Sequence, residues 1–348
     1  MTALAPLPLC EPSLSLEDGH GRTVRYIRLS VTDRCNLRCA YCRSGVETFI
    51  PHESVLRYEE MEQLVDMAMD MGVEKVRLTG GEPFARKGFM DFLERLRAAH
   101  PALDIRVTTN GTLLGPHIAA LKGIGLNAVN LSLDTFDRDK FDQITGRDLF
   151  GKVRESMDAL LEAGIPFKLN AVAMRGFNDD ELPAFIDYAL RHPVDVRFIE
   201  FMPMGEGTRW SDSRFWSAPD ILAAARRLVS LAPVDLDQRS GGPARLYTLS
   251  GPDGPGLGRL GLISPLTNHF CDSCNRLRIT SDGALRTCLF DDREYRLRNA
   301  LRHPKLGIEA VRRIVALATL QKPIGARLLE RRHAAEAVAL RRMTAIGG

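Results

Sequence analysis

The sequence lacks several features that would assign it to common classes of protein. No apolar run approaches the ~20 residues that a membrane-spanning helix requires. The apolar N-terminal stretch is short, contains proline and has no basic flank, so it does not predict a signal peptide. The 47 basic and 44 acidic residues give a net charge of only +3, too small to argue for nucleic acid. We therefore expect a cytoplasmic protein with neither a membrane nor a nucleic acid as its partner.

Cysteine is also scarce, with seven residues in a chain of 348. Six of the seven fall in two short clusters, and Cys10 stands alone near the N-terminus. Tight clusters of this kind are typical of metal ligands in a reducing compartment, whereas a disulfide framework spreads its cysteines along a small secreted domain. The scarcity therefore directs attention to two metal sites.

The first cluster has the spacing C-x3-C-x2-C, formed by Cys35, Cys39 and Cys42. Three thiolates fit three irons of a [4Fe–4S] cluster and leave the fourth iron open to a small molecule. A zinc knuckle would need a fourth ligand, for which His52 is the local candidate. A redox pair, or cysteines that merely lie close together, are the remaining alternatives.

The second cluster consists of Cys271, Cys274 and, after thirteen intervening residues, Cys288. It again has three cysteines and no obvious fourth. His269 could complete a Cys3His zinc site, and a second iron–sulfur cluster with an open iron is the other interpretation.

Arg276 and Arg278 follow the second cluster at the two-residue spacing that places both on one face of a strand. Two guanidinium groups beside a metal site are costly unless an anion binds there. The pattern therefore predicts a phosphorylated or carboxylate ligand, with a solvated basic edge strand as the plainer alternative.

Six apolar, β-branched runs alternate with amphipathic stretches, which indicates parallel βα units. The runs are 24–31, 75–79, 104–109, 128–133, 167–174 and 194–201. A doubly wound sheet is one architecture compatible with this pattern. Polar clusters follow the end of each run, however, and barrel enzymes build their sites from the loops at such strand ends. Six units rather than eight suggest an incomplete barrel.

The pattern changes after about residue 235, where Gly- and Pro-rich turns separate short strands. We expect a hairpin from 245–249 and 259–263, a second pair flanking 281–283, and helices from about 308 to 343. The predicted divisions are a flexible leader over 1–21, a barrel domain over 22–235 and an α+β extension over 236–348.

The first cysteine motif, with Tyr41 directly before its last cysteine, resembles the radical S-adenosylmethionine (SAM) superfamily. That resemblance implies a partial (β/α)6 barrel and an open iron that binds SAM, which is cleaved to a 5′-deoxyadenosyl radical. It also implies SAM contacts at Tyr41, at Gly81 of a GGEP motif, at Ser132 and at Met202. Without the resemblance, GGEP reads as a tight turn, Ser132 as a strand-end serine and Met202 as core filler.

Both cysteine motifs, the R-x-R of residues 276–278 and a terminal Gly347-Gly348 occur together in this chain. This combination resembles the GTP 3′,8-cyclase family of molybdenum cofactor biosynthesis over about residues 22–348. The resemblance implies that the second [4Fe–4S] cluster meets the guanine and that the Gly-Gly tail reaches into the site. Residues implied in catalysis are Arg28, Arg276, Arg278, Gly347 and Gly348, and those implied in GTP binding are Arg28, Lys75, Arg77, Thr108, Lys168, Arg197, Arg276, Leu277 and Arg278.

The implied reaction removes a hydrogen atom from C3′ of GTP and closes a bond from C3′ to C8, giving 3′,8-cyclo-7,8-dihydro-GTP. The implied partners are GTP, an external one-electron donor and a downstream cyclic pyranopterin monophosphate synthase, and a homodimer is an option that the sequence leaves open. Two other functions stay open at this point. One is a radical SAM enzyme acting on another nucleotide or a peptide, and the other is a zinc-containing nucleic-acid-binding module.

Overall fold

The computed structural model describes residues 16–42, 49–205, 209–235, 242–330, 339–341 and 343–347. The strands are β1 (Leu16–Glu17), β2 (Thr23–Val24), β3 (Tyr26–Thr32), β4 (Lys75–Gly80), β5 (Asp104–Thr109), β6 (Ala128–Ser132), β7 (Phe167–Ala173), β8 (Asp195–Glu200), β9 (Ser230–Pro233), β10 (Arg245–Gly251), β11 (Gly254–Ile263), β12 (Arg276–Ile279), β13 (Ala284–Arg286) and β14 (Tyr295–Arg296). The α-helices are α1 (Tyr58–Asp70), α2 (Phe89–Ala99), α3 (Ile118–Ile124), α4 (Arg138–Thr145), α5 (Phe150–Ala163), α6 (Leu182–Arg191), α7 (Ala218–Ala225), α8 (Leu297–Leu301), α9 (Gly307–Leu320), α10 (Gly325–Glu330) and α11 (Met343–Ile346).

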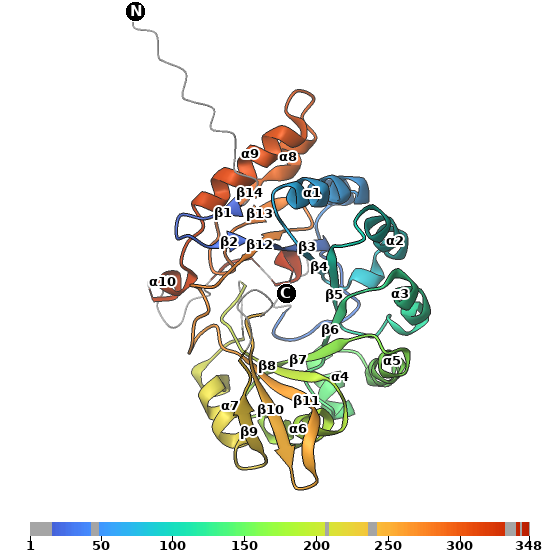
Figure 1. The fold of residues 1–348 in the computed structure, drawn as a ribbon, viewed down its shortest axis with the longest axis vertical. Coiled ribbons are helices and arrows are strands. Elements are labelled where there is room, and N and C mark those ends of the chain that lie inside the picture. Colours follow the sequence, from blue (N-terminus) through green and yellow to red (C-terminus); the bar gives the residue numbers. More distant parts are fainter. Residues whose placement is uncertain are drawn as a thin grey trace, which may run out of the picture.

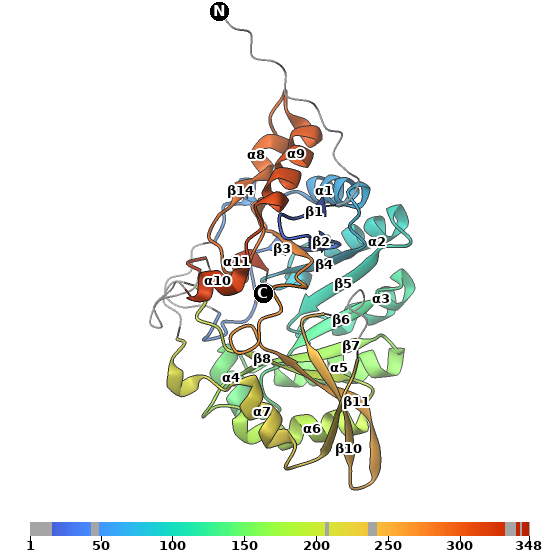
Figure 2. The same cartoon turned by 60° about the vertical axis from the view of Figure 1, so that its left-hand side comes forward.

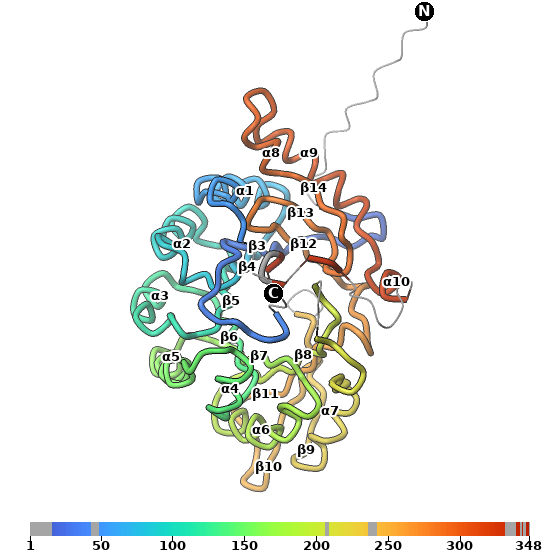
Figure 3. Tube along the Cα trace, turned by 180° about the vertical axis from the view of Figure 1, so that it is seen from behind, coloured from blue at the N-terminus to red at the C-terminus, as the bar shows by residue number. Residues whose placement is uncertain are grey.

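Strands β3 to β8 form a curved parallel wall in which each strand lies beside the next one in the sequence. Helices α1, α2, α3, α5 and α6 cover its convex side, and the described end of the chain lies on its concave side (Figures 1 and 3). A doubly wound sheet would instead reverse its strand order at a switch point. The fold is thus the predicted incomplete barrel of six βα units, and the doubly wound alternative is wrong.

The C-terminal part of the chain extends this wall from both of its edges. Strand β12 pairs in parallel with β3, and β11 pairs in parallel with β8. The predicted hairpin is present as β10 and β11, and the predicted pair around 281–283 as β12 and β13. Figure 2 shows the two extensions on opposite sides of the wall. The extension therefore frames the open side of the barrel, although the division near residue 235 stays a prediction.

Apolar and polar side chains alternate along the strands, and because successive side chains point to opposite faces, the wall has one apolar face and one polar face. Leu29, Leu78 and Val107 are fully buried in the apolar core. Their sequence neighbours Arg28 and Arg77 point to the concave side instead, where they line a cavity. Each strand thus packs against a helix with one set of side chains and presents polar groups to the inside with the other.

The beginning of the chain is described only from residue 16, so residues 1–15 of the predicted leader lie outside the described residues. Leu16–Glu17 pairs antiparallel with Thr23–Val24. Arg22 is buried and donates to Asp18, 2.6 Å away, and to the carbonyl oxygen of Cys271, 2.7 Å away. This segment therefore braces the second cysteine cluster. Within the described part of the chain, no helix has the length and apolarity needed to cross a membrane.

Candidate active site

A single cavity of about 700 Å³ lies on the concave side of the wall and reaches both cysteine clusters. The predicted site residues that line it are Cys35, Cys39, Cys42, Cys271, Cys274, Cys288, Tyr41, Gly81, Ser132, Met202, Arg28, Lys75, Arg77, Thr108, Lys168, Arg197, Arg276 and Arg278. Residues from 28 to 288 thus converge on one space, because they lie on strands that are neighbours in one sheet or in the loops that connect these strands.

Three predicted site residues are not part of this lining. Leu277 alternates with Arg276 and Arg278 on β12, so its side chain is fully buried in the apolar core. Gly347 lies next to the lining, where its carbonyl oxygen accepts a hydrogen bond from Arg278 Nη1 at 2.7 Å. Gly348 lies outside the described residues.

The GGEP turn after β4 packs tightly on the loop that leads into the first cysteine cluster. The Gly81 amide donates to the Thr32 carbonyl oxygen at 2.7 Å. A Cβ atom on Gly81 would lie only 2.1 Å from the Arg34 carbonyl oxygen, so no larger residue fits there. The glycine is therefore required to bring the turn against the cysteine loop, whatever ligand it meets.

Glu82 of the same turn connects the wall to Cys35. It is fully buried and accepts hydrogen bonds from Thr109 Oγ1 and from the Asn110 amide, both at 2.8 Å. Burial raises the pKa of Glu82 to about 7, although these hydrogen bonds oppose the rise. The Asn110 side-chain nitrogen lies 3.6 Å from Cys35 Sγ. This chain of contacts fixes the position of one thiol of the first cluster.

The first cluster also carries an excess of potential negative charge. Burial, Asp134 and the sulfurs of Cys42 and Cys35 together raise the pKa of Cys39 well above its usual range. Asp134 itself accepts a hydrogen bond from Tyr41 Oη at 2.8 Å, and burial raises the pKa of its carboxyl to about 6. Three thiolates can coexist here only with positive metal ions among them, so the donor set fits an iron–sulfur cluster.

The second cluster lies in a cationic setting. Burial alone would raise the pKa of Cys274, but Arg276 and Lys322 lower it to about 6. Lys322 is itself buried and places its Nζ atom 3.3 Å from Cys274 Sγ. A thiolate is thus favoured before any metal binds, as a metal ligand requires. His269, the candidate fourth zinc ligand, is exposed and does not line the cavity.

Gly325 at the start of α10 lies against two sulfurs of the second cluster. A Cβ atom built on it would be 2.9 Å from Cys288 Sγ and 3.5 Å from Cys271 Sγ. The two thiols therefore lie close to the same point at the start of α10. The arrangement fits a group that binds three cysteines at once.

Basic side chains dominate the rest of the cavity. Of the described residues that line it, nine are Arg or Lys and three are Asp or Glu. The basic ones are Arg28, Lys75, Arg77, Arg106, Lys168, Arg197, Arg245, Arg276 and Arg278, and the acidic ones are Asp134, Glu200 and Asp235. An excess of buried positive charge is costly without a counter-charge. The lining is therefore suited to a polyanion.

Four of these guanidinium groups surround Tyr26 at the start of β3. Burial would raise the pKa of Tyr26, but Arg77, Arg28, Arg276 and Arg278 together lower it. Burial and the neighbouring guanidinium groups of Arg77 and Arg276 likewise lower the pKa of Arg28 to about 10. Cations that are crowded in this way are strongly stabilised when an anion binds between them.

A second basic group lies across the cavity around Asp195, which is shared by several cations. Arg197 Nη2 and Lys168 Nζ approach one carboxylate oxygen at 2.9 and 3.6 Å, and Arg259 approaches the other at 2.7 Å. Burial and the charge of Arg197 lower the pKa of Lys168 to about 7, against the opposing effect of Asp195.

Several buried polar atoms of the wall have no hydrogen-bond partner among the residues that the structure describes. They include Arg77 Nε, Arg197 Nε, Thr108 Oγ1 and Asn170 Oδ1, and all four residues line the cavity. Unpaired buried polar atoms are rare in native proteins and point to a missing partner. A ligand with phosphate and hydroxyl oxygens would satisfy this set.

Tyr26 and Arg106 are among the residues that line the cavity and that the sequence reasoning missed. Each lies two positions before a predicted residue on the same strand, Tyr26 before Arg28 and Arg106 before Thr108. The two-residue period of a strand was the signal that could have found them.

Two known family models match successive parts of the chain. The model of the radical SAM superfamily matches residues 29–189. The model described as Molybdenum Cofactor Synthesis C matches residues 194–327. The first covers strands β3 to β7 with the first cysteine cluster, and the second covers β8 and the extension with the second cysteine cluster.

Curated relatives extend over most of the chain. A GTP 3′,8-cyclase of Syntrophomonas wolfei is 45% identical over 289 residues, which is 82% of this chain and 87% of the relative. One from Pelotomaculum thermopropionicum is 40% identical over 338 residues, which is 96% of this chain and all of the relative. One from Alkaliphilus oremlandii is 41% identical over 311 residues, 88% of this chain and 93% of the relative.

Among solved structures, SuiB of Streptococcus suis bound to S-adenosylmethionine resembles the fold with a TM-score of 0.59. The likeness covers 94% of this chain and 78% of SuiB, and the two sequences are 14% identical. This likeness concerns the fold alone. The curated relatives and the two family models show that the chain belongs to the GTP 3′,8-cyclase family of the radical SAM superfamily.

Proposed function

We propose that this chain converts GTP to 3′,8-cyclo-7,8-dihydro-GTP with SAM as the source of the radical, in molybdenum cofactor biosynthesis. The observation that carries the proposal is the single cavity that both cysteine clusters and nine basic residues line. A nucleoside triphosphate carries about four negative charges at one end, which such a lining neutralises. Membership in the GTP 3′,8-cyclase family supports the same reaction.

The first part of the site would hold SAM. Cys35, Cys39 and Cys42 would bind a [4Fe–4S] cluster, and Gly81, Ser132, Met202 and the backbone of Tyr41 would contact SAM. When bound, the cluster and SAM supply a one-electron cleavage that yields a 5′-deoxyadenosyl radical. The residues of the chain position the ribose of GTP and exclude water from the reacting atoms.

The second part would bind the substrate. Cys271, Cys274 and Cys288 would hold the auxiliary cluster near the guanine. The proposed GTP-binding residues on the wall are Arg28, Lys75, Arg77, Thr108, Lys168, Arg197, Arg276 and Arg278. Leu277 is proposed to contribute only through its position on β12 between Arg276 and Arg278. Supporting this, the unpartnered atoms of Arg77, Arg197 and Thr108 face the same cavity. The guanidinium groups hold the triphosphate and leave the ribose toward the first cluster.

The tail is proposed to complete the site. Gly347 has a φ of 75°, in the left-handed region that glycine tolerates. A Cβ atom there would lie 2.5 Å from Thr79 Cγ2, so a side chain would collide with the wall. Gly347 and Gly348 are therefore proposed to assist catalysis as residues small enough to enter the barrel.

The wider setting is also part of the proposal. An external one-electron donor must supply the electron, because SAM cleavage consumes one. A cyclic pyranopterin monophosphate synthase is proposed to take the product. We place the reaction in the cytoplasm and propose a homodimer as the assembly.

The test uses protein reconstituted anaerobically and mixed with SAM, GTP and a strong reductant. Mass spectrometry should detect 5′-deoxyadenosine together with a GTP isomer that converts to a pterin. Formation of 5′-deoxyadenosine without consumption of GTP would leave the first cluster as assigned and would refute the substrate. Absence of SAM cleavage from protein with intact clusters would refute the reaction class.

A further inference from the structure

The last described residues form a segment, 339–341 and 343–347, that packs beside Cys288 of the second cysteine cluster. We call it the tail segment. Ile346 is fully buried in a small apolar group with Met204, Phe290 and Ala339. Met202 and Cys288 pack against the same group. The tail segment thus touches both the proposed SAM side and the auxiliary-cluster side of the site.

Backbone contacts fix the two ends of the tail segment. At its start, the Ala339 carbonyl oxygen accepts a hydrogen bond from the Gly205 amide at 2.8 Å. At its end, the Gly347 carbonyl oxygen accepts one from Arg278 at 2.7 Å. Between these ends, α11 contacts β3 and β4. The second of these bonds joins the tail directly to a proposed GTP-binding arginine.

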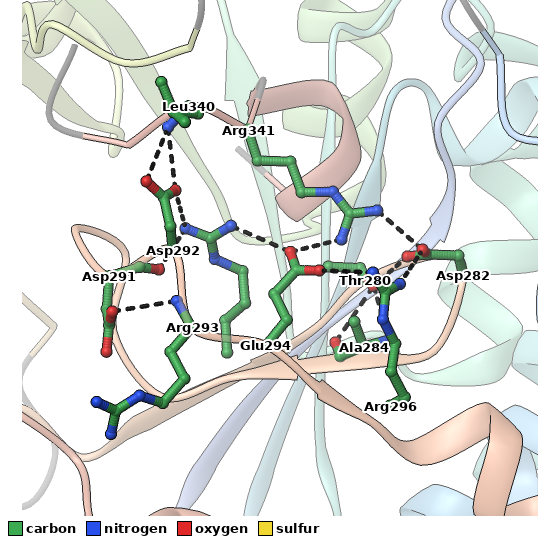
Figure 4. Close-up of polar contacts among 11 residues, drawn as sticks. Thr280, Asp282, Ala284, Asp291, Asp292, Arg293, Glu294, Arg296, Leu340 and Arg341 are labelled. Carbon is green, nitrogen blue, oxygen red and sulfur yellow. Dashed lines mark hydrogen bonds and ion pairs between the residues drawn. The ribbon is translucent and has the colours of Figure 1, made fainter.

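Arg341 holds the tail segment to the extension, because its guanidinium group forms ion pairs with two different carboxylates. Its Nη1 atom donates to Glu294 Oε1 at 2.6 Å, and its Nη2 atom donates to Asp282 Oδ2 at 2.8 Å (Figure 4). The two carboxylate side chains are only 13% and 10% exposed. Charge-assisted bonds of this geometry are stronger than neutral ones, and partial burial protects them from screening by salt.

The partners of Arg341 are themselves held in place. Arg286 is fully buried and donates to Glu294 at 3.2 Å. Arg296 donates to Asp282 at 3.2 Å, and the Leu340 amide donates to Asp292 at 3.0 Å (Figure 4). Glu294 and Asp282 would keep these cations if Arg341 were removed. The tail, by contrast, would lose its side-chain anchor.

Register links this network to the proposed substrate pocket. Strand β12 pairs with β13 so that Arg278 lies opposite Arg286. Directly opposed residues of an antiparallel pair share one face of the sheet, so Arg286, which bonds Glu294, lies beside Arg278, which bonds Gly347. The anchor at Arg341 and the end of the tail at Gly347 are therefore fixed to the same pair of strands.

We propose that Arg341 is a positioning residue for the proposed reaction: its ion pairs with Asp282 and Glu294 hold the tail so that Gly347 stays against Arg278. The inference rests on the proposed function, because the position of the tail matters only if GTP binds at Arg278. The proposal gives one arginine of the Arg-rich C-terminal region a positioning role that the sequence alone did not indicate.

The test compares cluster-loaded wild-type protein with Arg341→Ala, Arg341→Lys and, as a matched control, Arg296→Ala. Arg296 meets the same carboxylates from β14, and its side chain is 56% exposed. The first measurement is hydrogen–deuterium exchange of the amides of residues 343–347. Arg341→Ala loses two charge-assisted bonds, so its exchange should be roughly tenfold faster or more than that of the wild type. Exchange should be unchanged in Arg296→Ala and intermediate in Arg341→Lys.

The second measurement is steady-state conversion of GTP by the same four proteins, with iron content determined for each. We expect kcat to fall roughly tenfold in Arg341→Ala, with iron content unchanged and partial recovery in Arg341→Lys. Equal exchange rates in Arg341→Ala and wild type, or equal losses in Arg341→Ala and Arg296→Ala, would overturn the proposal. If even the wild type does not convert GTP, the proposed function fails, and the exchange rates still decide whether Arg341 anchors the tail.

Discussion

Replacing Gly325 with alanine tests the geometry assigned to the second cysteine cluster. Gly325 begins α10 and has no positive φ, so alanine meets no backbone strain there. Elsewhere in a helix the same change is favourable by up to about 1 kcal/mol, because alanine has the higher helix propensity. Here the added Cβ atom would lie 2.9 Å from Cys288 Sγ and 3.1 Å from a ring carbon of Phe290.

The magnitude follows from the space available. Ordinary contact begins near 3.4 Å, so the sulfur or the helix must move by about half an ångström to admit the methyl group. Metal sites tolerate deviations of only about 0.2 Å in their ligand distances. A shift of this size exceeds the tolerance when Cys288 Sγ takes it up, and that sulfur would bind the auxiliary cluster. We therefore expect Gly325→Ala to lose that cluster while it keeps the first one.

The assay is iron and sulfide analysis of the anaerobically reconstituted protein, with electron paramagnetic resonance of the reduced sample. Wild type should hold ~8 irons per chain and Gly325→Ala ~4, because each cube contains four. Gly123→Ala is the matched control, since that glycine lies inside α3 with no atom within 4 Å of the added methyl group. Full iron content and an unchanged spectrum in Gly325→Ala would refute the placement of Cys271 and Cys288 around one cluster.

Two further predictions concern the basic lining. Arg276→Ala and Arg278→Ala should each weaken GTP binding or turnover by roughly tenfold or more, through loss of charge-assisted bonds to the triphosphate, with iron content intact; unchanged activity in both would remove these arginines from the pocket. Because burial and Arg197 lower the pKa of Lys168 to about 7, its ammonium is present below that pH and lost above it. GTP should therefore bind more weakly as the pH rises from 6 to 8, and calorimetric titrations should show a smaller pH dependence for Lys168→Arg. Identical pH profiles for the wild type and Lys168→Arg would contradict the assignment of Lys168 to GTP binding.

Much of the fold was predictable because it depends on local patterns. The six parallel strands followed from near-continuous apolar runs, and the Gly- and Pro-rich turns marked the hairpin that became β10 and β11. The choice of a barrel over a doubly wound sheet needed more than periodicity. It came from the polar residues at the strand ends and from the family resemblance, and the sequential strand order confirmed it.

Residues of the candidate site were predictable where their type and their spacing along a strand or a motif indicated a role. They were missed where their position depends on contacts between segments distant in the sequence. The six cysteines and most of the arginines carried their own signals in spacing and charge. Nothing in the local sequence of Lys322 indicates that its Nζ atom lies 3.3 Å from Cys274 Sγ. Arg341 likewise looks like one more arginine of a basic ending until its contacts with Asp282 and Glu294 are seen.

The central claim is that the cavity holds GTP with its ribose toward the first cluster. The most direct test supplies the reconstituted enzyme with GTP that carries deuterium at C3′ and analyses the 5′-deoxyadenosine by mass spectrometry. The account predicts that one deuterium is transferred to 5′-deoxyadenosine and that a cyclised GTP isomer accumulates with it. Cyclised product accompanied by 5′-deoxyadenosine without deuterium, or deuterium-free 5′-deoxyadenosine with GTP left intact, would contradict it.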